Sequence, residues 1–174
     1  IPGGGGTKEL ALRVAYGFYE CDVKIPILID HFKSIATAAV STSASEAFDL
    51  HYLQENRDTI TYNVHRNIGL AKQKVIELAK DYIPPTFRSD IEVLGRSGMG
   101  TLYSAINEYR LGGYMSEHDE LISRKLAYVI CGGDLTGSQK VGEQYLLDIE
   151  REAFMSLLGE PKTLERIQYL LMNN

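Results

Sequence analysis

The stretch VGEQYLLDIEREAFMSLLG, residues 141–159, decides most about the fold. Its apolar residues recur three or four positions apart, which is the period of one face of an α-helix. They are Val141, Tyr145, Leu146, Ile149, Ala153, Phe154 and Leu157. Gly159 follows and predicts the end of this helix. The charge run Asp148, Glu150, Arg151 and Glu152 is interpreted as the solvated face, held by i,i+3 and i,i+4 pairs.

Helical patterns extend on both sides of this stretch. The spacing of apolar residues and the capping residues predict further helices over 7–15, 25–39, 43–50, 64–82, 100–110 and 116–131, and from Pro161 onward. The β-branched and aromatic run 59–62 predicts a short strand, and residues 90–94 predict a strand or extended lead. The diproline Pro84-Pro85 is the best internal boundary. We therefore expect a mainly α fold with one or two short strands at most.

Composition excludes several function classes. The chain has 174 residues, 44% of them hydrophobic, and a net charge of -5, so we expect no nucleic-acid partner. Cys21 and Cys131 have no zinc-like spacing, and two cysteines make no disulfide framework, which predicts a cytoplasmic location and no metal site. No apolar run approaches the ~18 residues of a membrane span, so we expect no transmembrane segment.

Two glycine segments could bind an anion. Gly3, Gly4, Gly5 and Gly6 lead through Thr7 into a helix, and free backbone N–H groups at such a helix start attract phosphate or a thioester oxygen. A tight turn for close backbone packing is the favoured interpretation, with ligand contact as the alternative. The second segment, 95–100, lacks the spacing and the following strand of a dinucleotide fingerprint, so we interpret it as a structural turn.

The titratable residues outside these segments are scattered. His118 lies in an acidic first turn, where we favour a solvated helix start over a catalytic acid or base. The 11 tyrosines lie mostly on or beside predicted helices and favour packing interfaces. These patterns alone indicate a mostly helical interaction or capping module.

A family resemblance adds to this interpretation. Residues 1–10, IPGGGGTKEL, resemble the I-P-G-x-G-G-T-x-x-L stretch of the crotonase (enoyl-CoA hydratase/isomerase) superfamily. Residues 43–53, SASEAFDLHYL, resemble its S-A-x-E-A-x-x-x-G-L segment, with His51 in place of the usual glycine. Residues 94–96, 112–119, 125–134 and 143–154 resemble the end of large bacterial fatty-acid oxidation proteins that place a 3-hydroxyacyl-CoA dehydrogenase portion before a crotonase-like domain.

The resemblance implies a C-terminal piece of such an enzyme. It identifies residues 1–83 with the end of the crotonase-like core and residues 86–174 with a helical C-terminal extension. The oxyanion hole, the catalytic glutamates and the NAD-binding fold of the family lie upstream of its I-P-G-x-G-G-T stretch. We therefore expect no catalytic, cofactor-binding or metal-binding residue here, with NAD used by the parent enzyme.

The role left to this piece, by resemblance, is to cover the acyl-CoA site and to contact the rest of its own polypeptide or other subunits. Gly3, Gly4, Gly5, Gly6 and Thr7 would then lie in the vicinity of the substrate pocket. Lys72, Lys74 and Lys80 are weighed as partners of CoA phosphates, although a solvated helix face is favoured.

The alternative to a fragment of an enzyme is an autonomous helical scaffold that binds protein partners. If the β-rich half is missing, we expect apolar helix faces to be left uncovered, notably the face of Ile25, Leu28, Phe32 and Ile35. Such a face would drive self-association, so a homo-oligomer is expected.

Overall fold

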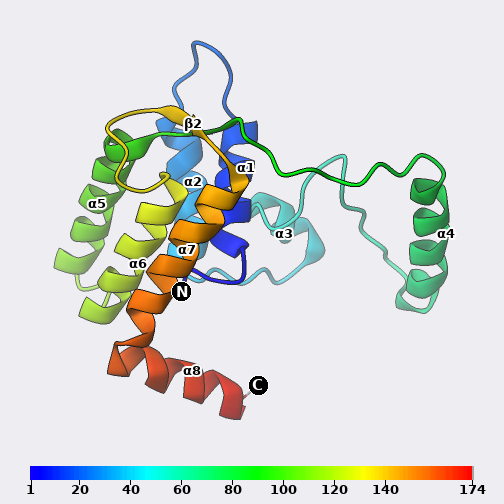
Figure 1. Ribbon diagram of the computed structural model, residues 1–174. Helices are drawn as coiled ribbons and strands as arrows, with labels where there is room; N and C mark the ends of the chain where they lie inside the picture. The colour runs from blue at the N-terminus through cyan, green and yellow to red at the C-terminus, as the bar shows by residue number, and fades with distance from the viewer. Residues whose placement is uncertain (174) are drawn as a thin grey trace. The chain divides into compact units, whose positions relative to one another are not determined.

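The helix predicted from residues 141–159 is α7 (Glu143–Leu158) in a computed structural model that describes residues 1–173 (Figure 1). Leu146, Ile149, Ala153 and Leu157 form its buried apolar face, and the helix stops before Gly159 as predicted. Helices dominate the rest of the described chain as well: it contains eight α-helices and two short strands, with 61% of residues helical. The expected mainly α fold is confirmed.

The described chain forms two compact units. The larger unit consists of residues 1–38 together with the chain from Phe87 onward, and the smaller unit consists of residues 39–86. One boundary, between Thr86 and Phe87, therefore lies one residue beyond Pro84-Pro85. Residues 1–38, however, share a unit with the second half of the chain, and the division into 1–83 and 86–174 stays a prediction.

Helix α6 (Glu117–Ile130) is the centre of the larger unit. It packs against α1 (Gly6–Tyr16), α2 (Ile25–Ala36), α5 (Gly95–Leu111) and α7. The largest buried apolar side chains come from several of these helices and form one core; they include Leu28, Leu102, Val129, Ile130, Leu146 and Leu157. Helix α8 (Pro161–Asn173) begins at Pro161 as predicted, contacts α7, and buries only Thr163.

The larger unit also contains two strands of three residues each. Strand β1 (Ile91–Val93) pairs antiparallel with β2 (Gln139–Val141), with Ile91 opposite Val141 and Val93 opposite Gln139. Ile91 and Val93 point into the core and are almost fully buried. The pairing joins two segments that lie on either side of α5 and α6 in the sequence.

The smaller unit has hardly any core. It contains α3 (Ala44–Asp49), the short 3-10 helix η1 (Val64–Arg66) and α4 (Asn67–Ala79). Ser43 caps α3 as predicted, because its Oγ accepts a hydrogen bond of 3.1 Å from the Glu46 backbone N–H. Within residues 39–86, all of which the structure describes, Ala47 is the single buried residue.

The structure contradicts two of the sequence predictions, one about a strand and one about an uncovered helix face. Residues 59–62 form no strand, because no strand of the described chain lies beside them to complete a ladder. The face of Ile25, Leu28, Phe32 and Ile35 is covered: Leu28 and Phe32 are buried in the core, while Ile25 and Ile35 pack against it. Residues 1–38 therefore find their apolar partners within the larger unit.

The sequence also led us to expect no transmembrane segment, which concerns the length and apolar character of the helices. Among residues 1–173, none of the helices combines the length and the apolar character that crossing a bilayer requires.

Candidate functional site

The glycine segment at residues 3–6 forms a tight turn that starts α1. Gly4 and Gly5 have φ values of 63° and 85°, the left-handed region that glycine adopts without strain. The Gly6 N–H donates to the Gly3 carbonyl at 3.2 Å and closes the turn. No side chain of the turn itself caps the helix, because Gly5 occupies the N-cap position. The Gly6 N–H is satisfied within the turn, but the next N–H group of α1, that of Thr7, needs a partner from elsewhere.

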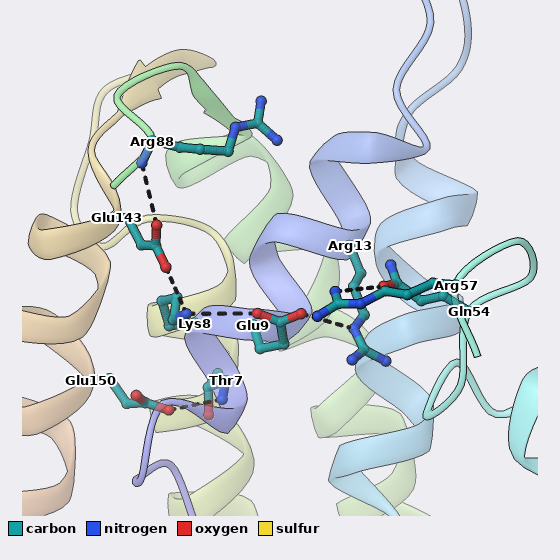
Figure 2. A network of polar contacts seen from close by, with 9 residues as sticks. All are labelled: Thr7, Lys8, Glu9, Arg13, Gln54, Arg57, Arg88, Glu143 and Glu150. Carbon is teal, nitrogen blue, oxygen red and sulfur yellow. Dashed lines mark hydrogen bonds and ion pairs between the residues drawn. The ribbon is translucent and has the colours of Figure 1, made fainter. Parts of the chain in front are cut away.

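Glu150 of α7 supplies that partner. Its carboxylate accepts hydrogen bonds from the Thr7 N–H at 2.7 Å and the Gly3 N–H at 3.2 Å, and the residue is only 2% exposed. Figure 2 shows the Glu150 side chain reaching from α7 to Thr7 at the start of α1. The position where an external anion was considered is thus occupied by a carboxylate of the chain itself, which supports the tight-turn interpretation.

The interpretation of the charge run on α7 needs a correction at Glu150. Asp148 and Arg151 do form an i,i+3 pair at 2.9 Å on the exposed face. Glu150 instead lies on the buried face, at the four-three-four spacing of Leu146, Glu150, Ala153 and Leu157. That spacing was the signal available in the sequence, because a carboxylate in register with an apolar stripe requires buried partners.

A second acidic side chain of α7 extends this contact between helices. Glu143 accepts a hydrogen bond from Lys8 Nζ at 2.8 Å, and its other carboxylate oxygen accepts from the Arg88 backbone N–H at 3.3 Å (Figure 2). The hydrogen bond from Lys8 holds the pKa of Glu143 below its ordinary value. Burial alone would lower the pKa of Lys8, but the hydrogen bond and charge of Glu143 outweigh it and raise that pKa. Glu143 and Glu150 together attach the start of α1 to α7.

Arg88 continues the polar contacts toward the end of α1. Its guanidinium lies 4.5 Å from the centre of the Tyr16 ring, and its Nε donates to Asp90 at 2.9 Å. This hydrogen bond raises the pKa of Arg88 and lowers that of Asp90. The arrangement is an ion pair with a stacked aromatic ring, which is typical of a structural contact.

The second glycine segment is structural, but the interpretation as a turn and the predicted helix start at residue 100 are wrong, because residues 95–100 form the first turns of α5 (Gly95–Leu111). Helix α5 begins at Gly95 itself, where φ is 57° and an added Cβ would lie 2.6 Å from the Gly137 carbonyl oxygen. An added Cβ on Gly98 would lie 2.7 Å from the Leu94 Cβ. These glycines therefore allow close packing. The antiparallel pairing of β1 with β2 also differs from the parallel strands of a dinucleotide-binding unit.

His118 does not lie at a solvated helix start. Ser116 caps α6 by accepting from the Asp119 N–H at 3.1 Å, but the His118 ring is 7% exposed and its Nε2 lies 3.0 Å from Thr163 Oγ1 of α8. Thr163 is fully buried. The pair attaches α8 to α6. The burial of His118 could not be predicted from its neighbours, because acidic residues beside it are typical of a solvated helix start. Among residues 1–173, no group of three or more His, Cys, Asp or Glu side chains could hold a metal ion.

Apolar side chains are exposed on the surface of two helices, α4 and α8. In α4, Ile68, Val75 and Leu78 are 85%, 64% and 59% exposed, and no residue of the helix is buried. In α8, Leu171 and Met172 are 80% and 73% exposed. Lys74 of α4 pairs with Glu77 at 3.2 Å, and Lys72 and Lys80 are also exposed. These faces have the composition of contact surfaces.

The two cysteines differ in environment. Cys131 is fully buried beside Gly98, and burial raises the pKa of its thiol to about 12. Cys21 is exposed. A buried thiol that stays protonated is a poor nucleophile, so Cys131 is a core side chain.

Comparison with known proteins gives one extensive similarity. The chain is 40% identical over 172 residues to a protein of Bacillus subtilis (strain 168) described as a probable 3-hydroxyacyl-CoA dehydrogenase. The match includes 99% of this chain but only 21% of the relative, so the chain spans about a fifth of the relative's length. No family model matches the chain, and no solved structure matches it.

Proposed function

We propose that this chain is a segment of a 3-hydroxyacyl-CoA dehydrogenase of fatty-acid β-oxidation. The observation that carries the proposal is the 40% identity along nearly the whole chain to a relative with that description. The parent enzyme would oxidise 3-hydroxyacyl-CoA with NAD as the hydride acceptor. It would work in the cytoplasm as a homo-oligomer.

The segment itself would serve as a non-catalytic part of that enzyme. In this proposal it is the end of a crotonase-like acyl-CoA domain, and it covers the acyl-CoA site while contacting other parts of the polypeptide or other subunits. Gly3, Gly4, Gly5, Gly6 and Thr7 lie in the vicinity of the substrate pocket. The Glu150 hydrogen bonds support a positioning role for this turn, because they fix the start of α1 without an external anion.

A second candidate function is a helical scaffold that binds protein partners. The observation that favours it is the exposed apolar face of α4, which would become buried on binding. Both candidates require a partner for this face. They differ in whether the partner belongs to the same polypeptide.

The test uses the complete reading frame that encodes this chain. We expect the full product to form NADH from a 3-hydroxyacyl-CoA and NAD, and the 174-residue chain to form none. Inactivity of a correctly folded full product would contradict the dehydrogenase proposal. Turnover by the 174-residue chain alone would contradict its non-catalytic role, because the chain would then have to contain the reaction site.

A further inference from the structure

Five polar side chains line a pocket of about 360 Å³ in the larger unit. Helix α6 packs against both α5 and α7, and all three helices contribute to the pocket (Figure 1). The polar residues are Tyr103 of α5, Arg124, Lys125 and Tyr128 of α6, and Glu152 of α7. Leu121 and Ala153 provide the apolar part. Ligand pockets typically have ~300–1,000 Å³ and combine apolar walls with a few polar groups, so this pocket suits a small molecule.

Arg124 is held in place but keeps one donor group for a ligand. Its guanidinium lies 4.8 Å from the centre of the Tyr103 ring, and its Nε and Nη2 each lie 2.9 Å from Glu120 Oε1. The remaining nitrogen, Nη1, makes no hydrogen bond within residues 1–173. A guanidinium that is already fixed by stacking and an ion pair loses little side-chain entropy on binding, and its planar donors match the oxygens of an anion.

Three further donors of the pocket have no hydrogen-bonding or ionic partner in the part of the chain that the structure describes. They are the Lys125 ammonium and the hydroxyls of Tyr103 and Tyr128. Burial raises the pKa of Tyr103, and burial together with the charge of Glu152 raises the pKa of Tyr128. Both phenols are therefore protonated at neutral pH and can donate a hydrogen bond. A set of unused donors that includes two cations suits an anion with several oxygen atoms.

Glu152 supplies the carboxylate of the pocket. It is exposed and forms no ion pair within the described residues 1–173. Glu150 binds the glycine turn, and Glu152 lies ~200° further around α7, so the two carboxylates face different surroundings. An ionised carboxylate can only accept hydrogen bonds, and a hydroxyl of the ligand would donate to it. The ligand that uses the whole lining therefore carries hydroxyl groups in addition to an anionic group.

The volume of the pocket limits the size of this ligand. At ~30 Å³ per water-sized group, the pocket admits roughly twelve non-hydrogen atoms. A three-carbon phosphate ester such as glycerol 3-phosphate has about this size, whereas a nucleotide is larger.

We propose that this pocket binds a small phosphate ester that carries hydroxyl groups, the chemical class of glycerol 3-phosphate. Arg124 and Lys125 donate to the phosphate oxygens, together with the hydroxyls of Tyr103 and Tyr128. Glu152 accepts a hydrogen bond from a hydroxyl of the ligand. Phosphate suits these donors better than a carboxylate does, because it offers three acceptor oxygens instead of two. The inference goes beyond the proposed function and does not depend on it.

Isothermal titration calorimetry on the full product of the reading frame tests the inference. Glycerol 3-phosphate, inorganic phosphate, glycerol and adenosine monophosphate are the separate probes. Lys125→Gln removes one cation of the pocket, and Tyr128→Phe removes one hydroxyl. The matched controls are Lys33→Gln on α2 and Tyr169→Phe on α8, which are exposed and do not line this pocket. Circular dichroism verifies that each variant is folded.

We expect glycerol 3-phosphate to bind with a millimolar or lower Kd, inorganic phosphate to bind more weakly, and glycerol not to bind. Lys125→Gln should weaken the binding of glycerol 3-phosphate by at least about tenfold, because it removes a charge-assisted hydrogen bond. Tyr128→Phe should weaken it by about fivefold. Both control variants should bind like the unmodified protein. Glu152→Gln should narrow the preference for glycerol 3-phosphate over inorganic phosphate, because only the ester has a hydroxyl for this carboxylate.

Several outcomes would overturn the inference. They are no saturable binding of glycerol 3-phosphate at millimolar concentration, and binding that neither Lys125→Gln nor Tyr128→Phe weakens. An equal loss of affinity in Lys33→Gln would overturn it too, because the effect would then reflect only the overall charge. Tighter binding of adenosine monophosphate would contradict the size of the proposed ligand. Since binding is measured without turnover, a product that binds glycerol 3-phosphate as expected but lacks dehydrogenase activity would contradict only the proposed function.

Discussion

Helices α7 and α4 share a sequence pattern but differ in what surrounds them. Both have apolar residues at helical spacing, over 16 residues in α7 and 13 in α4. Helix α7 buries five residues, including Glu150, whereas α4 buries none. Amphipathic periodicity therefore predicts that a segment is helical, but it does not show that a partner for its apolar face lies on the same stretch of chain.

The difference has an energetic consequence. A helix shorter than ~12–15 residues is marginal in water by itself, and most helical stability in proteins comes from the packing of an amphipathic face. Helix α7 obtains that packing from α1 and α6. Helix α4 contacts η1 within its own unit, and its apolar face is open. We expect its stability to depend on a partner.

The largest expected contrast comes from truncating one leucine in each helix. Leu146→Ala in α7 removes a fully buried side chain and should lower the free energy of unfolding by about 3 kcal/mol. Leu78→Ala in α4 removes a side chain that is 59% exposed and should change it by less than ~0.5 kcal/mol. Urea unfolding followed by circular dichroism measures both. Equal losses would show that the face of α4 is packed in solution.

The next effect concerns the buried carboxylate of α7. Glu150→Ala leaves the N–H groups of Gly3 and Thr7 without their acceptor and should cost about 2 kcal/mol of unfolding free energy. The matched control is Glu152→Ala on the same helix, where the side chain is exposed and the cost should be below ~0.5 kcal/mol. A cost at Glu150 no greater than at Glu152 would show that α1 starts independently of α7.

The third effect is the pH dependence of the contact between α1 and α7. Because the pKa of Glu143 is lowered in the folded chain, its contribution is present above the ordinary value of 4.5 and is lost as pH falls through the lowered pKa. Lys8 acts in the opposite direction, since its raised pKa makes its contribution decline only above pH 10.5. Glu143→Gln should therefore reduce the acid dependence of the melting temperature. If the melting temperature of Glu143→Gln depends on acid pH as strongly as before the substitution, other carboxylates cause that dependence.

The smallest expected effect on overall stability comes from Ala71→Gly in α4. Glycine disfavours a helix by about 1 kcal/mol relative to alanine at an exposed interior site. Since α4 makes no buried contact, the loss should appear as faster hydrogen exchange of α4 amides, while the unfolding midpoint of the larger unit stays unchanged. Ala127→Gly in α6, at a fully buried position, should lower that midpoint. A lowered midpoint for both variants would indicate that the two units unfold together.

Local signals in the sequence were sufficient for most of the helices. Ser43, Ser116, Gly159 and Pro161 lie at helix ends as predicted, because caps and breakers act over a few residues. Strand β2, with the sequence Gln-Lys-Val, was not predicted. Three residues without alternation contain no local strand signal, and only the pairing with β1 makes them a strand.

The candidate site was harder to predict than the helices. The turn at Gly3–Gly6 was identified from its glycines, but its partner Glu150 lies 143 residues beyond Thr7 in the sequence. Charged neighbours on α7 made Glu150 resemble a solvated residue. The burial of His118 depends in the same way on Thr163 of a later helix. Contacts between distant segments decide which charged side chains become buried; the spacing on α7 indicates that Glu150 is buried, but it does not identify Gly3 and Thr7 as its partners.

The discontinuous larger unit also constrains how the chain is made. Thr7 leaves the ribosome 143 residues before Glu150, and at ~5–20 residues per second this delay is roughly 7 to 30 s. During that interval α1 has been synthesised, but the carboxylate that accepts hydrogen bonds from the Gly3 and Thr7 N–H groups has not. Helix α1 therefore lacks its Glu150 hydrogen bonds until α7 has been translated.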